Sequence, residues 1–159
     1  MTKFCLYAIV VLGLSGVVAF GQAAGGGQAG NGPVIRNQAP ADKALDIPAS
    51  TLTAEFADMA AKKRVTTRMI EGGAYSLNAR YLTGTEPAQV HKSIIEFYFI
   101  KDGTAMLVTG GKIVDKVIQG GVERSVKAGD TIFIPPGIPH GFKNATGISY
   151  LNIHFGGTD

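Results

Sequence analysis

Two short stretches of the sequence contain the residue types that hold metal ions. The first contains Gln89, His91 and Glu96, and the second places His140 shortly after the prolines and glycine of residues 135–137. Two imidazoles and one carboxylate form the set of ligands that non-haem iron(II) uses, and manganese, nickel, zinc or copper suit the same ligands. The amide of Gln89 is a weaker ligand, so it either binds loosely or forms a hydrogen bond beside the metal.

The first stretch can bring its ligands together only if the chain bends. Side chains two residues apart share one face of a strand, but His91 and Glu96 are five residues apart. A bend or bulge near residues 92–93 is therefore predicted between them. Glu96 lies in an apolar run, where an inward carboxylate without a partner is costly, and a cation is the simplest partner. A metal-free domain whose polar side chains only form hydrogen bonds is the alternative.

The second stretch predicts a strand, a tight turn and another strand. Residues 131–134 form the first strand, and residues 135–137 offer proline at the second turn position and glycine at the third, as a type II turn requires. The second strand then places His140, Phe142 and Asn144 on one face. A histidine beside a turn fixed by prolines is well placed to act as a metal ligand or a catalytic base.

The rest of the chain predicts an all-β domain with one helix. Residues 50–64 carry apolar side chains near a 3.6-residue period, which indicates a helix that packs outside a sheet. Frequent glycine turns separate short strands, as in a sandwich or barrel. Strands are predicted over residues 65–70, 75–82, 93–101, 104–109, 112–118, 122–126, 131–134 and 148–155.

Other polar and aromatic residues are predicted around the site. Tyr98 and Phe142 lie two residues beyond Glu96 and His140, so they are expected to line a pocket, although both could belong to the core. Tyr98 and Glu96 are candidates for moving a proton. Arg80 is a candidate for holding a substrate carboxylate, with a solvated strand residue as the alternative.

Two further expectations concern the mouth of the domain. His154 alternates with apolar residues 151, 153 and 155, so it is predicted to point outward and not to bind metal. Residues 112–126 are predicted to cover the mouth of the barrel and to influence specificity.

These residues resemble the motifs of the cupin family. The second cupin motif is matched at every specified position by Gly129, Pro135, Gly137, His140 and Asn144. The first motif is matched by His91, Glu96 and Gly103, but Gln89 stands where the family has its first histidine, and Gly84 is one residue too close. The resemblance covers about residues 75–155.

The resemblance implies a small double-stranded β-helix, the jelly-roll barrel of cupins, with the predicted N-terminal helix outside it. It also implies a metal inside the barrel, at the positions of Gln89, His91, Glu96 and His140, and often a homodimer.

The N-terminus has the features of a signal peptide. Lys3 precedes an apolar run over residues 4–20, and small residues follow at a suitable cleavage site. Residues 1–23 are therefore predicted to be removed, and the mature protein to be periplasmic or secreted; an uncleaved membrane anchor is the alternative. Residues 24–48 are predicted to form a flexible, glycine-rich leader, and residues 49–159 a single cupin domain. Cys5 lies in the predicted signal, so the mature chain would contain no cysteine.

Three functional classes fit this sequence. The first is a non-haem metal-dependent dioxygenase or oxidoreductase, with Fe²⁺ favoured over Mn²⁺, Ni²⁺, Zn²⁺ and Cu²⁺, that acts on a small anionic or enolisable molecule. The alternatives are a metal-dependent lyase, decarboxylase or isomerase, and a barrel that only binds a small molecule. The formal charge of +3 is small and dispersed, which argues against nucleic-acid binding. No membrane association is expected once the signal is cleaved.

Overall fold

The computed structural model describes residues 33–156, in which strands predominate. The predicted signal peptide, residues 1–23, lies outside the described residues, as does the first part of the predicted leader. The elements are β1 Val34–Ile35, α1 Ala49–Lys62, β2 Thr66–Glu71, β3 Tyr75–Gly84, β4 Ile95–Asp102, β5 Thr104–Thr109, β6 Lys112–Val114, β7 Val117–Gln119, β8 Val122–Lys127, β9 Thr131–Ile134, β10 His140–Lys143 and β11 Ala145–Phe155. In the described part of the chain, no helix has both the length and the apolar character needed to cross a membrane.

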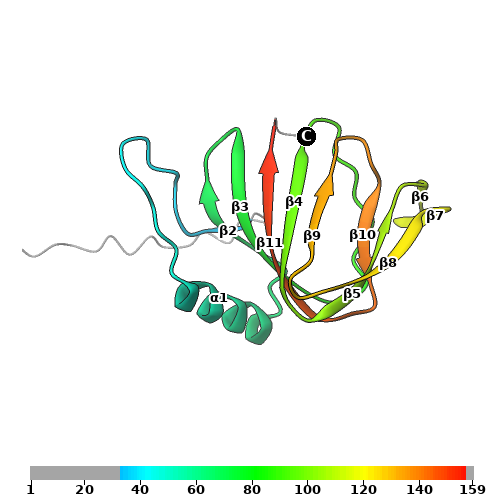
Figure 1. The fold of residues 1–159 in the computed structure, drawn as a ribbon, viewed down its shortest axis with the longest axis horizontal. Coiled ribbons are helices and arrows are strands. Elements are labelled where there is room, and N and C mark those ends of the chain that lie inside the picture. The colour runs from blue at the N-terminus through cyan, green and yellow to red at the C-terminus, as the bar shows by residue number, and fades with distance from the viewer. Residues whose placement is uncertain (1–32, 157–159) are drawn as a thin grey trace, which may run out of the picture. The chain divides into compact units, whose positions relative to one another are not determined.

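The strands form two main sheets and a small hairpin (Figure 1). The larger sheet has the order β1-β2-β3-β11-β4-β9, the smaller sheet has the order β10-β5-β8, and β6 pairs with β7. The long strand β11 is antiparallel to β3 on one side and to β4 on the other. The prediction of an all-β, double-stranded β-helix barrel with one outer helix is confirmed.

Helix α1 packs on the outer face of the larger sheet. Its apolar side chains Leu52, Phe56 and Met59 contact Met69 of β2 and Ala79 of β3. The helix ends at Lys62, close to the predicted end, and Lys63 follows it in the left-handed conformation, with φ of 53°. Its amphipathic period therefore indicated correctly that it packs outside the sheet.

Part of the predicted leader belongs to the sheet. Val34 and Ile35 pair in parallel with β2, and Gln38 forms a further bridge with Glu71. This pairing covers an edge of β2 whose backbone groups would otherwise lack partners in the sheet. The ordered domain therefore begins near Val34, earlier than the predicted boundary at residue 49.

One predicted strand is two strands. The segment 112–118 forms the hairpin β6–β7, which turns at Asp115 and Lys116 with φ values of 49° and 65°. Two consecutive residues with positive φ are characteristic of a type I′ turn, for which asparagine and glycine are the usual signals. Because Asp-Lys is not such a signal, this turn could not be predicted from the sequence.

The interior of the barrel has an apolar part and a polar part. The apolar part is a cluster that includes Leu82, Ile100, Leu107, Val126, Ile132, Phe142, Ile148 and Tyr150. The polar part includes the buried side chains of Ser76, Asn78, Glu96, His140 and Asn152. Buried polar groups must be hydrogen-bonded or paired, so the polar part is where a site is expected.

A buried carboxylate joins α1 to the sheet. Glu55 is 7% exposed, accepts a hydrogen bond from Thr67 at 2.7 Å, and forms ion pairs with Arg36 at 2.9 Å and Arg64 at 2.7 Å. Burial alone would raise the pKa of Glu55, but Thr67, Arg64 and Arg36 together hold it below its usual value. The ionised carboxylate therefore stabilises the fold.

We expect Glu55→Gln to lower the free energy of unfolding by about 3 kcal/mol at neutral pH, because two guanidinium groups lose their carboxylate. The pKa of Glu55 is lower in the folded protein than in the unfolded chain, so its stabilisation is complete above the usual carboxyl value of 4.5. Below that pH the difference between parent and variant should shrink, as measured by urea unfolding. Exposed Asp42→Asn is the control, and a difference that does not change with pH would contradict the assignment.

Candidate metal centre

Backbone hydrogen bonds hold the two predicted stretches together. Gln89 lies opposite His140 in an antiparallel bridge, in which each N–H donates to the carbonyl of the other residue, at 2.8 and 2.9 Å. The N–H of Gly137 donates to the carbonyl of His91 at 2.7 Å. Gly137 has φ of 78°, as the third position of the predicted type II turn requires. The turn therefore fixes the loop that carries the first histidine.

The predicted bend between His91 and Glu96 is confirmed. The chain bends at residues 92–93, and β4 begins immediately afterwards, at Ile95. Glu96 then points into the barrel and is 1% exposed. One potential ligand atom from each of His91, Glu96 and His140 lies within 4.8 Å of the other two. The structure therefore brings together the three residues that the sequence singled out.

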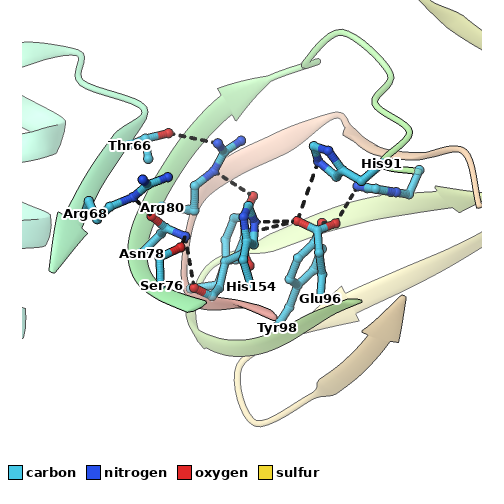
Figure 2. A network of polar contacts seen from close by, with 12 residues as sticks. Thr66, Arg68, Ser76, Asn78, Arg80, His91, Glu96, Tyr98 and His154 are labelled. Carbon is cyan, nitrogen blue, oxygen red and sulfur yellow. Dashed lines mark hydrogen bonds and ion pairs between the residues drawn. The ribbon is translucent and has the colours of Figure 1, made fainter. Parts of the chain in front are cut away.

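Polar side chains surround the carboxylate of Glu96 (Figure 2). Its Oε2 atom lies 2.7 Å from Nε2 of His140 and accepts a hydrogen bond from the hydroxyl of Tyr98 at 3.0 Å. Its Oε1 atom accepts a hydrogen bond from the amide of Asn152 at 3.1 Å and lies 2.6 Å from Nε2 of His154. Nε2 of His91 lies 3.9 Å from Oε1.

The prediction that His154 points outward is wrong. In β11, the side chains of Tyr150, Asn152 and His154 share the inner face, and the backbone register places His154 opposite Glu96. The apolar residues 151, 153 and 155 lie on the outer face. Hydrophobic alternation misled the prediction because the interior is polar at this end and the outer face is apolar.

His140 is held with one ring nitrogen toward Glu96. Its Nδ1 atom lies 2.8 Å from the carbonyl of Ile138, and because a carbonyl only accepts, Nδ1 carries the hydrogen. In the neutral ring, Nε2 then presents a lone pair to the carboxylate. Burial lowers the pKa of His140, but the contact with Glu96 more than offsets this and raises it. The arrangement needs a cation between the two groups, either a proton or a metal ion.

Glu96 and Tyr98 each have one protonation state at neutral pH. Burial alone would raise the pKa of Glu96, but the contacts with His140 and His154 hold it far below its usual range. Burial raises the pKa of Tyr98, and nearby Tyr150 and Glu96 raise it further. At neutral pH, Glu96 is therefore a carboxylate and Tyr98 a protonated donor.

Tyr98 and Phe142 are core residues as much as site residues. They are 4% and 1% exposed, and their ring centroids lie 5.8 Å apart. Tyr98 contacts Glu96 through its hydroxyl, whereas the described contacts of the Phe142 ring are with Tyr98 and Tyr150. Phe142 therefore supports the site from the apolar part of the barrel.

Arg80 is neither solvated nor available for a substrate. It points inward and forms an ion pair with Glu86 at 2.8 Å. It also donates to the hydroxyls of Thr66 at 2.8 Å and Tyr150 at 3.3 Å. A role in holding a substrate carboxylate is not supported, since its donors already have partners within the protein. The sequence could not indicate this, because Glu86 lies in a loop whose course depends on the fold.

The hairpin β6–β7 contacts the loop that precedes Gln89. The carbonyl of Lys116 accepts a hydrogen bond from the N–H of Ala88 at 2.9 Å. The hairpin helps to line a pocket formed by Thr85, Glu86, Ala88, Val108, Lys116, Val117, Ile118, Glu123, Gly141, Phe142 and Lys143. None of the histidines around Glu96 lines this pocket, and the role of residues 112–126 as a cover of the barrel mouth stays a prediction.

The comparisons with known proteins identify the family. A family model described as "Cupin domain" matches residues 82–154. A Neisseria meningitidis protein of known structure shares 15% identity over 65% of this chain and 95% of its own, with a TM-score of 0.50. A Bacillus halodurans protein shares 15% identity over 64% and 78%, with a TM-score of 0.50. A comparison with curated proteins finds no significant match. Residues 82–154 therefore form a cupin domain.

The donor set fits the divalent metal ion that cupins commonly bind. The potential ligands are two nitrogens, from His91 and His140, and one oxygen, from Glu96. Because only one of them is a carboxylate, a site that holds a divalent ion keeps a net positive charge. The side chains of Gln89 and His140 leave the backbone on the same face, since residues directly opposite in an antiparallel pair share a face. Coordination by Gln89 stays a prediction.

Proposed function

We propose that this chain is a metal-binding cupin that acts as a non-haem dioxygenase or oxidoreductase on a small anionic or enolisable molecule. The observation that supports the proposal is the convergence of His91, Glu96 and His140, whose potential ligand atoms lie within 4.8 Å of one another. When bound, an iron(II) ion would supply open coordination positions for a chelating substrate and for oxygen. Manganese, nickel, zinc and copper suit the same donors.

The residues around the site favour an anionic ligand. Glu96 contributes one negative charge, which does not neutralise a divalent ion. Asn152 donates to Oε1 and Tyr98 donates to Oε2 of Glu96, so both oxygens are held and the carboxylate is oriented before a substrate binds. Tyr98 stays protonated because its pKa is raised, so its role is to donate a hydrogen bond and not to remove a proton.

A strip of polar side chains extends from the site across the inner face of the larger sheet (Figure 2). Arg68 donates to Asn78 at 3.2 Å, and Asn78 donates to Ser76 at 3.1 Å. Asn78 also approaches the carbonyl of Asn152 at 3.4 Å, and Asn152 contacts Glu96. This network orients Asn152 and, through it, the carboxylate of Glu96.

Two other functions use the same geometry. In a metal-dependent lyase, decarboxylase or isomerase, the metal would act as a Lewis acid on an anionic substrate without consuming oxygen. A cupin that only binds a small molecule would need no redox metal. Oxygen consumption by the iron-loaded protein with a panel of small keto acids and enolisable diketones distinguishes the first class from these two.

We expect the parent protein, expressed as the full chain, to contain about one divalent transition metal ion per chain by elemental analysis. Glu96→Ala and His140→Ala should each lose this ion, because each removes a ligand and leaves its partner buried without a counter-charge. Glu123→Ala, at an exposed carboxylate outside the cluster, is the matched control and should retain the metal. A parent protein that stays metal-free after incubation with iron, manganese, nickel, zinc and copper would contradict the proposal.

We also infer that the protein forms a homodimer through the outer face of β4, β9 and β11. Phe97 packs against Phe133 and Phe155, with ring centroids 5.2 and 6.3 Å apart, and α1 covers only the β2 and β3 part of this face. Phe133 and Phe155 remain 55% and 45% exposed. A contiguous aromatic patch of this kind is typical of interfaces.

The dimer can be tested by light scattering after size-exclusion chromatography. Phe133→Asp should halve the measured mass, because a charge within the patch opposes its burial. Val122→Asp changes another exposed apolar residue, 70% exposed on β8, and should leave the mass unchanged. A parent that elutes as a monomer at all concentrations would contradict the interface.

Export to the periplasm or the medium is proposed from the N-terminal sequence, which lies outside the described residues. Expression with the native N-terminus in a bacterial host should yield an exported chain that begins close to residue 24, because the small residues at 19–23 suit signal cleavage. The mass of the purified chain measures this directly. Recovery of the intact chain from the membrane fraction would instead favour an uncleaved anchor.

A further inference from the structure

We propose that His154 is a fourth metal ligand and supplies the imidazole that cupins usually have at the position of Gln89. The inference rests on the proposed metal-binding function and specifies its ligands. The site would then contain three imidazoles and one carboxylate, from His91, Glu96, His140 and His154, and Gln89 would lie outside the ligand set.

The geometry around Glu96 places one imidazole beside each oxygen of the carboxylate. Nε2 of His154 lies 2.6 Å from Oε1, and Nε2 of His140 lies 2.7 Å from Oε2. The ring centroid of His91 lies 5.7 Å from that of His140 and 5.7 Å from that of His154. His91 therefore lies at the same distance from two imidazoles that flank one carboxylate.

The contact between His154 and Glu96 is not an ordinary hydrogen bond. Nε2 of His154 is buried and has no hydrogen-bond partner of normal geometry, although Oε1 lies only 2.6 Å away. Nε2 of His140 is likewise buried and has no hydrogen-bond partner. Two ligand atoms about 2.1 Å from one metal ion and at roughly right angles lie about 3 Å apart. Close contacts that are not hydrogen bonds are therefore what shared coordination of a cation would produce.

The chain holds His154 more firmly than it could hold a ligand at residue 89. His154 belongs to β11, which is paired on both sides, with Glu96 of β4 and Ser76 of β3 opposite His154 itself. Gln89 is held by a single isolated bridge. Sites built on strands inside a sheet are better positioned than sites on loops. The last strand can therefore replace the missing histidine without a change in the barrel.

The test is to count the imidazoles around Cu²⁺ by pulsed electron paramagnetic resonance, together with metal affinity by competition with a chelator. The parent should show three imidazoles. His154→Gln should show two and bind metal at least about tenfold more weakly. Glutamine keeps an amide that can donate to Oε1, so a histidine that only oriented Glu96 would be replaced without loss of an imidazole. Gln89→Ala should leave both measurements unchanged.

A rescue variant makes the result specific. Gln89→His combined with His154→Gln should return the count to three, because the imidazole is restored at the usual cupin position. Circular dichroism and thermal unfolding of each variant would show that the barrel is retained. Two imidazoles in both the parent and His154→Gln would overturn the inference while leaving the metal site in place. A parent that binds no metal would overturn the proposed function, and the inference with it.

Discussion

The buried negative charge of Glu96 is the constraint on which the rest of the structure depends. A carboxylate that is 1% exposed is costly unless charges and donors compensate it. Two donors, Tyr98 and Asn152, satisfy part of this requirement, and the imidazoles of His140 and His154 lie close enough to share a cation with it. The interior of the barrel beside Glu96 therefore favours the binding of a cation.

The residues that meet this charge come from distant parts of the chain, so the fold must bring them into register. Strand β11 pairs with β4 and thereby places Asn152 and His154 beside Glu96. The turn at Gly137 and the bridge between Gln89 and His140 join the two loops that carry the other imidazoles. These backbone hydrogen bonds fix the segments that carry the imidazoles, which is what a site with narrow geometric tolerance needs.

The interior of the barrel contains two polar clusters and an apolar core. Arg80 and Glu86 form a second, partly buried ion pair, but their donors and acceptors are occupied by Thr66, Tyr150 and the backbone of Phe142, so they serve the structure. The groups around Glu96 face the partly exposed His91 and His154 instead, each with a side chain 22% exposed. The barrel itself does not fix the reaction, because one fold supports many.

Local sequence patterns predicted most of the strands, the helix and three of the site residues. The spacing of residues 129–144 specified a turn and a strand that begins with His140, and the five-residue interval before Glu96 required the bend at residues 92–93. Apolar periodicity also located α1 and most strands. These features are local, because turn chemistry and side-chain alternation depend on near neighbours in the chain.

Which face of β11 lies inside the barrel depends on contacts between strands that are distant in the sequence. The same alternation fits either face, and the pairing of β11 with β4 selects the face that carries His154. Likewise, the partner of Arg80 and the pairing of Val34 with β2 depend on segments that approach only after folding. A polar interior reverses the usual meaning of hydrophobic alternation, so the residues nearest the buried charge were the ones that the sequence pattern could not assign.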